Sequence, residues 1–228
     1  MFRLFSAARA ERILEEHAAG IAACETDYGV PAPVLRAILF QEITRIDLWD
    51  VFADLAVSLY WLRYRLREAL HCAEPLPLIR RGVLGKRDSS TGYAQIFARV
   101  AIGALNTARA HGLTPPVSGA IPPMRALDPA APGDLMRVWL ALRRDRAFNL
   151  ACAALNLRAA AEEMTGRYSF DGCTEAELKR ILTRYNANVK SVTPYGEEAY
   201  RHYLRYASPE GDRTGQDAAP DAGGGGKS

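Results

Sequence analysis

An acidic residue interrupts the apolar face of a predicted helix early in the chain. In residues 31–47, PAPVLRAILFQEITRID, the positions spaced at i, i+3, i+4 and i+7 are Leu35, Ile38, Leu39 and Glu42. Burial among apolar side chains disfavours the charged form of a carboxyl group and raises its pKa. A glutamic acid that stays protonated near neutral pH can act as a general acid, for example on the leaving oxygen of a glycosidic bond.

Glu42 also has a purely structural explanation. It could lie at the end of the helix, reach solvent, or pair with Arg36 or Arg45 of the same predicted helix. Because the spacing alone does not separate these alternatives from a catalytic role, the decision depends on the rest of the chain.

Four segments follow one another in a recognisable order. They are AILFQE, which ends at Glu42, SSTGYAQIF at 89–97, the small-residue segment FNLACAALNLRAA at 148–160, and RYNAN at 184–188 followed by YGEEAYRHYL at 195–204. This ordered set resembles the soluble lytic transglycosylases and goose-type lysozymes of the lysozyme-like superfamily. The resemblance covers roughly residues 30–205.

The resemblance implies that Glu42 is the general acid and then the base. Gly92 to Ile96 stands where the family has a Gly-Leu-Met-Gln-Ile-like stretch, and Tyr185 to Ala187 matches the centre of its Ala-Tyr-Asn-Ala-Gly-like motif. A later tyrosine, Tyr195 or Tyr200, would close the pattern.

The chain also departs from the family pattern at several points. Ile43 stands where serine is usual, and Asn188 stands where glycine is preferred. Glu42 and Gln95 are far apart, with a long apolar segment between them, whereas the family usually keeps the two motifs close. A diverged or inactive member of the group is compatible with these differences.

The same resemblance implies substrate contacts from Ser90, Thr91, Tyr93, Gln95, Tyr185, Asn186 and Tyr195. Each has an alternative: Ser90, Thr91 and Gln95 could mark the start of a helix near Tyr93, whose ring could equally belong to the core. Tyr185 could be a core residue, and Asn186 could cap the end of a helix. Tyr195 could hold the proton of Glu42 or simply begin a helix.

A second carboxylate is needed only if the reaction inverts the sugar by activating a water molecule. Asp88, in GKRDSSTG just before the Gly92 motif, is the first candidate, although its position in a turn favours a residue that caps its own loop through its side chain. Asp47 and Asp50 are weaker candidates, since acidic residues there suit the start of the next helix.

Helical periods dominate the rest of the sequence. We expect helices at about 6–25, 33–45, 48–71, 93–111, 134–144, 146–165, 175–188 and 195–207, with a capping box at Thr174 and Glu177 opening the seventh. The segment 48–71 carries one apolar stripe, and a small hairpin could form near 79–88. The prediction is an all-α, lysozyme-like domain over residues 1–207, followed by a disordered tail at 208–228.

Composition limits the other function classes. The net charge of +3 is too small to argue for nucleic acid, and four scattered cysteines form no zinc pattern, so we expect no metal and no cofactor. Those cysteines could be free thiols or form two disulfides. We expect neither a classical signal peptide nor a transmembrane segment.

The function expected from the resemblance is cleavage of the β-1,4 bonds of peptidoglycan. A chitinase- or chitosanase-like hydrolase on the same scaffold is the first alternative, and a non-catalytic helical module with a degenerate sugar cleft is the second. Without a signal peptide, a wall-degrading protein would need a dedicated secretion or lysis system, and a protective immunity partner would be its natural companion. An open groove shared by Glu42, Gln95 and Asn186 favours the enzyme, whereas Glu42 closed in the core against an arginine favours the module.

Overall fold

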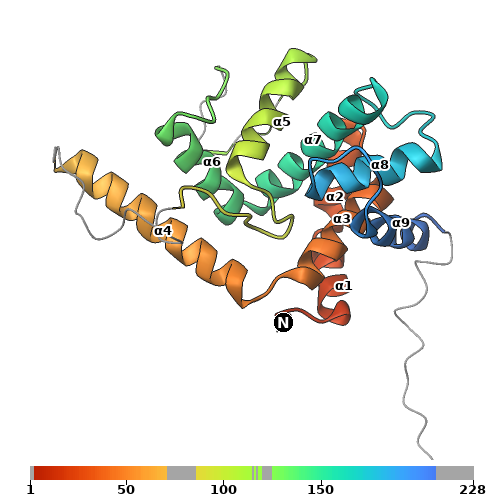
Figure 1. Cartoon of the computed structure of the whole chain (residues 1–228), viewed down its shortest axis with the longest axis horizontal. Coiled ribbons are helices and arrows are strands. Elements are labelled where there is room, and N and C mark those ends of the chain that lie inside the picture. Colours follow the sequence, from red (N-terminus) through yellow and green to blue (C-terminus); the bar gives the residue numbers. More distant parts are fainter. Residues whose placement is uncertain (1–2, 71–85, 115, 117, 120–124, 209–228) are drawn as a thin grey trace, which may run out of the picture.

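The computed structural model describes residues 3–70, 86–114, 116, 118–119 and 125–208. Within these residues the chain is built from nine α-helices without a sheet, which confirms the predicted all-α fold class (Figure 1). The helices are α1 (Ala7–Glu16), α2 (Ala18–Tyr28), α3 (Ala32–Arg45), α4 (Leu48–Ala69), α5 (Ala98–Ala110), α6 (Pro132–Arg144), α7 (Arg146–Thr165), α8 (Glu175–Asn186) and α9 (Pro194–Ala207).

Two of the predicted helix boundaries are wrong. The helix expected at 6–25 is divided at His17 into α1 and α2, and His17 itself has φ −111° and ψ 9°. The helix expected from Tyr93 begins only at Ala98, because residues 91–96 form a turn closed by an isolated bridge between Thr91 and Ile96. Most of the predicted hairpin, and the predicted tail apart from Ser208, lie outside the described residues.

Helix α7 lies at the centre of the core and contacts α2, α5, α6 and α8. Its segment Leu150 to Leu157 is apolar or small almost throughout and is buried on every side. A helix that is apolar all round has to be surrounded by other elements, and its alanines allow those elements to approach closely. The small-residue segment in the sequence therefore corresponds to the central helix of the fold.

Helices α3, α8 and α9 meet beside this core, and α9 packs against both of the others. Gly196 in the first turn of α9 sits so close to α8 that a Cβ atom there would lie 1.9 Å from the Thr183 hydroxyl oxygen and 2.8 Å from the Lys179 carbonyl. Only glycine permits this approach. The close crossing fixes the position of the neighbouring Tyr195 against the end of α3.

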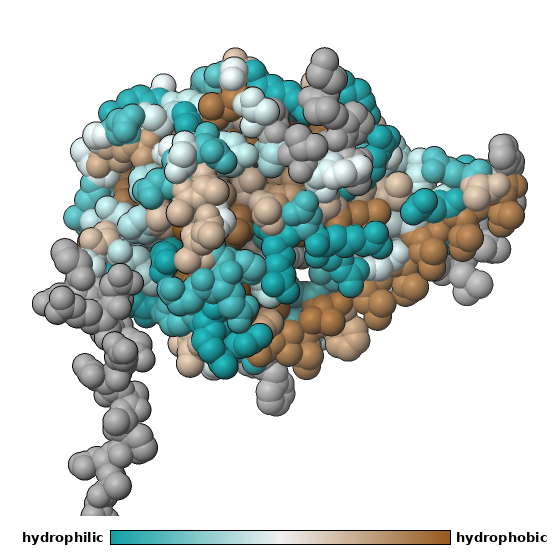
Figure 2. All heavy atoms as spheres, turned by 180° about the vertical axis from the view of Figure 1, so that it is seen from behind, coloured by the Kyte–Doolittle hydropathy of each residue, from teal (hydrophilic) through white to brown (hydrophobic). Residues whose placement is uncertain are grey.

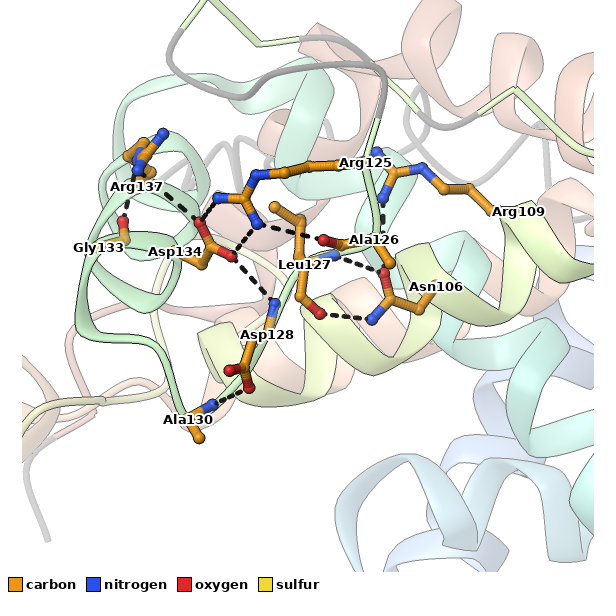
Figure 3. Close-up of polar contacts among 10 residues, drawn as sticks. All are labelled: Asn106, Arg109, Arg125, Ala126, Leu127, Asp128, Ala130, Gly133, Asp134 and Arg137. Atoms are coloured by element: carbon orange, nitrogen blue, oxygen red, sulfur yellow. Dashed lines mark hydrogen bonds and ion pairs between the residues drawn. The ribbon is translucent and has the colours of Figure 1, made fainter.

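A polar cluster attaches the loop before α6 to the helical body, as Figure 3 shows. The buried Asp134 carboxylate accepts hydrogen bonds from the Arg125 guanidinium and from the Asp128 amide, the latter at 3.0 Å. Asn106 of α5 donates to the Leu127 carbonyl at 2.7 Å and accepts from the Leu127 amide at 3.0 Å. The hydrogen bond from Arg125 lowers the pKa of Asp134, and the Arg125 charge adds to this effect, so the carboxyl group is held in its ionised form.

Helix α4 is the exception to the compact packing, because it projects away from the other helices (Figure 1). Its buried residues, Ala56, Val57 and Trp61, face the body of the protein. The predicted apolar stripe lies on the opposite side and is exposed. Among the described residues, no helix combines the length and the apolar character that crossing a bilayer requires.

Candidate active site

Glu42 is buried near the carboxyl-terminal end of α3, with 9% of its surface exposed. Burial raises its pKa to about 7, against the opposing effects of a hydrogen bond from Tyr195 and the charge of Arg45. The Tyr195 hydroxyl donates to Oε1 of Glu42 at 2.5 Å. Glu42 is therefore a buried carboxyl group, held by one hydrogen bond, with a pKa near neutral.

The two arginines that could have neutralised Glu42 have other carboxylate partners. Arg36 pairs with Glu15 at 2.9 Å, and Arg45 pairs with Glu198 at 2.6 Å. Arg45 also lies over the Tyr195 ring, 4.8 Å from its centroid, so it still acts on Glu42 from a distance.

A second hydrogen bond joins α9 to α3 next to the contact between Glu42 and Tyr195. Gln41 donates its side-chain amide to the Tyr195 carbonyl at 3.0 Å, and both groups are buried. Consecutive residues of α3, Gln41 and Glu42, thus hold the carbonyl and the hydroxyl of one tyrosine. This double attachment fixes the direction from which the phenol approaches the carboxyl group.

Glu42 opens onto a pocket of about 200 Å³, whose other lining residues are Arg45, Ile46, Asp47, Asp50, Gln95 and Asn186. Three residues singled out in the sequence, Glu42, Gln95 and Asn186, come from three separate segments and meet here. Six of the seven lining residues are polar or charged, so the pocket offers several hydrogen-bonding groups to a hydroxyl-rich ligand.

A second pocket of about 300 Å³ adjoins the first and shares Ile46, Asp50 and Gln95 with it. Tyr93 lies on its lining, half-buried, with its ring 5.4 Å from the His17 ring and 5.6 Å from the Arg146 guanidinium. The two pockets together form an extended depression that is polar beside Glu42 and more apolar around the Tyr93 ring.

The turn at 91–96 carries Gln95 into both pockets. Gly92 has φ +73°, and a Cβ atom there would lie 2.3 Å from the Asn149 amide nitrogen, so the position requires glycine. Gln95 also has positive φ, 45°, and its side chain donates to the Gly92 carbonyl at 2.8 Å. The positive-φ backbone at Gly92 and Gln95 is held in place by hydrogen bonds from a residue outside the turn.

Asn149 of α7 supplies those bonds, and the sequence interpretation did not single it out. Its Oδ1 accepts from the Ala94 amide at 3.0 Å, and its Nδ2 donates to the Thr91 carbonyl at 3.2 Å. Asn149 also lines the second pocket. The only feature of the sequence that could have pointed to Asn149 is its polar side chain near the start of the small-residue segment, next to Phe148.

The other predicted contact residues lie around the turn. Thr91 is buried and donates its hydroxyl to Asp54 of α4 at 2.9 Å, and Ser90, half-buried, lies outside the lining of both pockets. The Tyr185 hydroxyl donates to the Ala94 carbonyl at 2.8 Å, which supports the turn from the side of α8. Thr91 and Tyr185 thus position the turn.

Asp88 lies away from the Glu42 pocket and lines neither depression. Its two carboxylate oxygens accept hydrogen bonds from the first amides of α5, Ala98 at 2.9 Å and Arg99 at 3.0 Å. These are the amides that lack partners at the start of a helix. Burial raises the pKa of Asp88, and the two amides oppose that rise.

Asp50 is a carboxyl group that lines the Glu42 pocket. It forms a capping box with Asp47 at the start of α4, in which its Oδ2 accepts from the Asp47 amide at 2.9 Å. Burial raises the pKa of Asp50, and the nearby Asp47 and Asp54 add to the rise. The two weaker sequence candidates, Asp47 and Asp50, thus line the pocket, and the first candidate, Asp88, caps α5.

The described cysteines are free: Cys24 and Cys152 are buried, and Cys173 is partly exposed, while Cys72 falls outside the described residues. No cluster of three metal-binding side chains occurs in the described part of the chain. No protein-family model, no curated protein and no solved structure matches this chain. The functional argument therefore rests on the geometry of the Glu42 pocket.

Proposed function

We propose that this protein cleaves β-1,4-linked amino-sugar polymers, with peptidoglycan as the substrate and Glu42 as the general acid and base. The observation that carries the proposal is the environment of Glu42. It is a buried carboxyl group with a pKa of about 7, hydrogen-bonded to Tyr195 and open to a polar pocket that also holds Gln95 and Asn186.

The chemistry follows from the proton on Glu42. In the first step the protonated carboxyl group donates to the glycosidic oxygen as the bond to the anomeric carbon breaks, which leaves Glu42 as a carboxylate. The Tyr195 hydroxyl stabilises that carboxylate by its hydrogen bond. In the second step Glu42 takes a proton from the nucleophile that attacks the anomeric carbon.

The nucleophile distinguishes lytic cleavage from hydrolysis. In lytic cleavage it is a hydroxyl group of the sugar itself, which closes an anhydro ring and needs only one carboxyl group. In inverting hydrolysis it is a water molecule, activated by a second carboxylate roughly 6.5–9.5 Å from the first. Asp50 is the better placed second carboxylate, because it lines the pocket, whereas both oxygens of Asp88 bond to α5. We propose the lytic route, since the capping role of Asp50 already engages one of its oxygens.

The purified full chain should release soluble fragments from isolated cell-wall sacculi, with anhydro-muropeptides identified by mass. Glu42→Gln should abolish release while the circular dichroism spectrum stays unchanged, and Glu16→Gln, on the exposed side of α1, should behave as the wild type. Persistent cleavage by Glu42→Gln would mean that the acid has been misassigned.

The same assay separates the alternatives. Reducing ends in place of anhydro ends, together with loss of activity in Asp50→Asn, would indicate an inverting hydrolase. Cleavage of chitin or chitosan but not of sacculi would indicate the chitinase- or chitosanase-like alternative. Binding of sacculi without any cleavage would identify a non-catalytic module. Delivery by a dedicated secretion or lysis system and a protective partner belong to the peptidoglycan proposal and fall with it.

A further inference from the structure

The second pocket holds a positively charged side chain that has no acidic partner. Arg146, the first residue of α7, lines this pocket beside Tyr93. Its guanidinium lies over the Tyr93 ring, 5.6 Å from the ring centroid, and within the described residues it forms no ion pair. The pocket's other arginine, Arg143, is engaged elsewhere, because it donates to the Ser58 hydroxyl and lies over the Trp139 ring. Arg146 therefore has its N–H donors available to a ligand in the pocket.

The acidic groups of the same pocket come from α4 and are used within the chain. Asp54 accepts hydrogen bonds from the Ser89 hydroxyl at 2.7 Å and from the Thr91 hydroxyl at 2.9 Å. Asp50 accepts a backbone amide at 2.9 Å in its capping box. The apolar row of α4, the brown band along the projecting helix in Figure 2, lies on the other side of that helix, away from the pocket. Its members are Leu48, Phe52, Leu55, Leu59, Leu62 and Leu66.

The Tyr93 ring restricts where the Arg146 guanidinium can lie. Tyr93 is half-buried, and its ring lies 5.4 Å from the ring of His17, at the junction of α1 and α2. A guanidinium over an aromatic ring makes that contact through its flat face, so the N–H donors in its plane remain available for hydrogen bonds. Burial, and then the Arg146 charge, lower the pKa of His17, so near pH 7 the positive charge at this place belongs to Arg146.

A carboxylate is the ligand group that matches these donors. Two parallel N–H groups of a guanidinium fit the two oxygens of a carboxylate, and such charge-assisted pairs are the strong hydrogen bonds of proteins. Phosphate also fits a guanidinium, but it carries nearly two charges at neutral pH, and Asp50 and Asp54 would repel it more strongly than a monoanion. The rest of the lining is largely apolar with a few polar groups, which is typical of a small-molecule site.

The position of the pocket connects this carboxylate to the proposed substrate. The second pocket shares Ile46, Asp50 and Gln95 with the Glu42 pocket, so a polymer with a glycosidic bond at Glu42 extends into it. Muramic acid carries a lactyl ether, whose carboxyl group is free in glycans without peptides. In the intact wall that group bears the stem peptide, which has carboxylates of its own. Chitin and chitosan carry no carboxylate.

We propose that Arg146 binds a carboxylate carried by a muramic acid unit, and that the second pocket thereby selects peptidoglycan over amino-sugar polymers without carboxylates. The identity of the polymer rests on the proposed function, whereas the carboxylate site follows from Arg146, Tyr93 and the pocket they line. Arg146 is then a specificity-determining residue, which separates the peptidoglycan substrate from the chitin-like alternatives.

The test is the binding of defined saccharides to the full-length Glu42→Gln chain, measured by calorimetry. The probes are the disaccharide of N-acetylglucosamine and N-acetylmuramic acid with a free lactyl group, the same disaccharide with its lactyl group converted to the primary amide, the disaccharide carrying alanyl-isoglutamine, and chitobiose. We expect a carboxylate-bearing probe to bind about 10-fold or more tightly than the amide. Preference for the free lactyl form places the carboxylate on the lactyl group, and preference for the dipeptide form alone places it on the stem peptide.

Variants of Arg146 assign the preference to this side chain. Arg146→Gln should make the carboxylate and amide probes bind equally, and Arg146→Lys should keep part of the preference, because it retains the charge but not the paired donors. Arg144→Gln is the matched control, since Arg144 is an exposed arginine at the end of α6 that lines neither pocket. Arg146 is exposed and its side chain makes no hydrogen bond in the described part of the chain, so folding should be retained, as circular dichroism checks.

Binding and cleavage are measured separately, so this inference and the proposed function can fail independently. Equal binding of the carboxylate and amide probes overturns the carboxylate site, even in a protein that cleaves sacculi. An equal loss of preference in Arg144→Gln and Arg146→Gln also overturns it, and so does the absence of binding to every probe at millimolar concentration. A preference that depends on Arg146 in a chain that does not cleave sacculi supports the site and refutes the enzyme.

Discussion

Tyr195, at the start of α9, donates its hydroxyl to the carboxyl group of Glu42 in α3, across 153 positions of the sequence. The two residues are 5% and 9% exposed, so the hydrogen bond is made in an environment that water hardly reaches. Burial raises the pKa of Glu42 and the tyrosine limits the rise. The pair sets the pH range in which Glu42 can both give and take a proton.

Tyr195→Phe should move the alkaline limb of the pH–activity profile to higher pH. The hydroxyl stabilises the carboxylate, so its removal raises the pKa of Glu42 further and keeps the acid protonated longer. The rate of cleavage should fall, because the carboxylate formed in the first step loses a donor. The measurement is the pH dependence of fragment release, with the pKa of Glu42 followed by carbon NMR of the labelled carboxyl group.

Tyr185→Phe is the control for this variant. The Tyr185 hydroxyl is also buried, but it donates to the Ala94 carbonyl and makes no hydrogen bond to Glu42. It should lower stability by about 1 kcal/mol, in line with the loss of one hydrogen bond, and leave the pKa of Glu42 where it is. Equal shifts in both variants would refute the specific role of Tyr195.

Glu42 should make the protein less stable as the pH rises toward 7. Its pKa is about 7 in the folded chain and 4.5 in the unfolded chain, so the folded state holds a proton that the unfolded state has released. The stabilisation is complete below about pH 4.5 and is lost as the pH rises through about 7, and its full size is roughly 3 kcal/mol.

Glu42→Gln should remove this dependence, since glutamine does not titrate. Urea unfolding between pH 4 and pH 8 measures it, and the variant should gain stability relative to the wild type as the pH rises. A wild-type curve that is flat from pH 4.5 to pH 7, or that rises there because of Glu42, would contradict the raised pKa.

Gly92 and Asn149 should show strong energetic coupling. Gly92→Ala places a methyl group against the Asn149 amide and also strains a residue with φ +73°, so it should cost several kcal/mol. In an Asn149→Ala background the steric part disappears and only the backbone strain remains.

A double-mutant cycle by chemical denaturation therefore measures the contact directly. Gly92→Ala should cost at least about 1 kcal/mol less in the Asn149→Ala background than in the wild type. Additive effects would indicate that the turn does not press against Asn149 in solution.

Asp134→Asn should loosen the loop before α6. The Arg125 guanidinium lowers the pKa of Asp134, so its stabilisation is present above the unfolded pKa and is lost as the pH falls through the lower folded value. At neutral pH the loss of the charged pair should cost about 1–3 kcal/mol. Hydrogen exchange should accelerate at the Leu127 and Asp128 amides, which the cluster in Figure 3 protects.

Asp128→Asn serves as the control for the loop. Its carboxylate accepts only the nearby Ala130 amide at 2.8 Å in an exposed turn, and asparagine keeps an acceptor there. Its effect on stability should stay within about 0.5 kcal/mol. A similar loss in both variants would argue that Asp134 has no special place in the cluster.

The positions of the helices were largely predictable because their signals are local. The capping box of Thr174 and Glu177 opens α8 as predicted, and α3 and α9 begin within one residue of the expected positions. A cap involves residues three positions apart, and a helical stripe needs only neighbours along the chain. The predictions failed where the deciding contacts were more distant. Helix α5 begins only after the turn at 91–96, which Asn149 of α7 holds, and Asp88 caps its first amide from ten positions earlier.

The sequence by itself determined that the chain is helical and that Glu42 follows the apolar positions of its helix. Only the tertiary structure decided that Glu42, Gln95 and Asn186 meet in one pocket, that Asp50 joins them while Asp88 does not, and that the apolar row of α4 faces outward. Helix formation depends on backbone hydrogen bonds within a few residues. Which faces are buried depends on the packing of segments far apart in the chain, and that packing determined where the pocket formed.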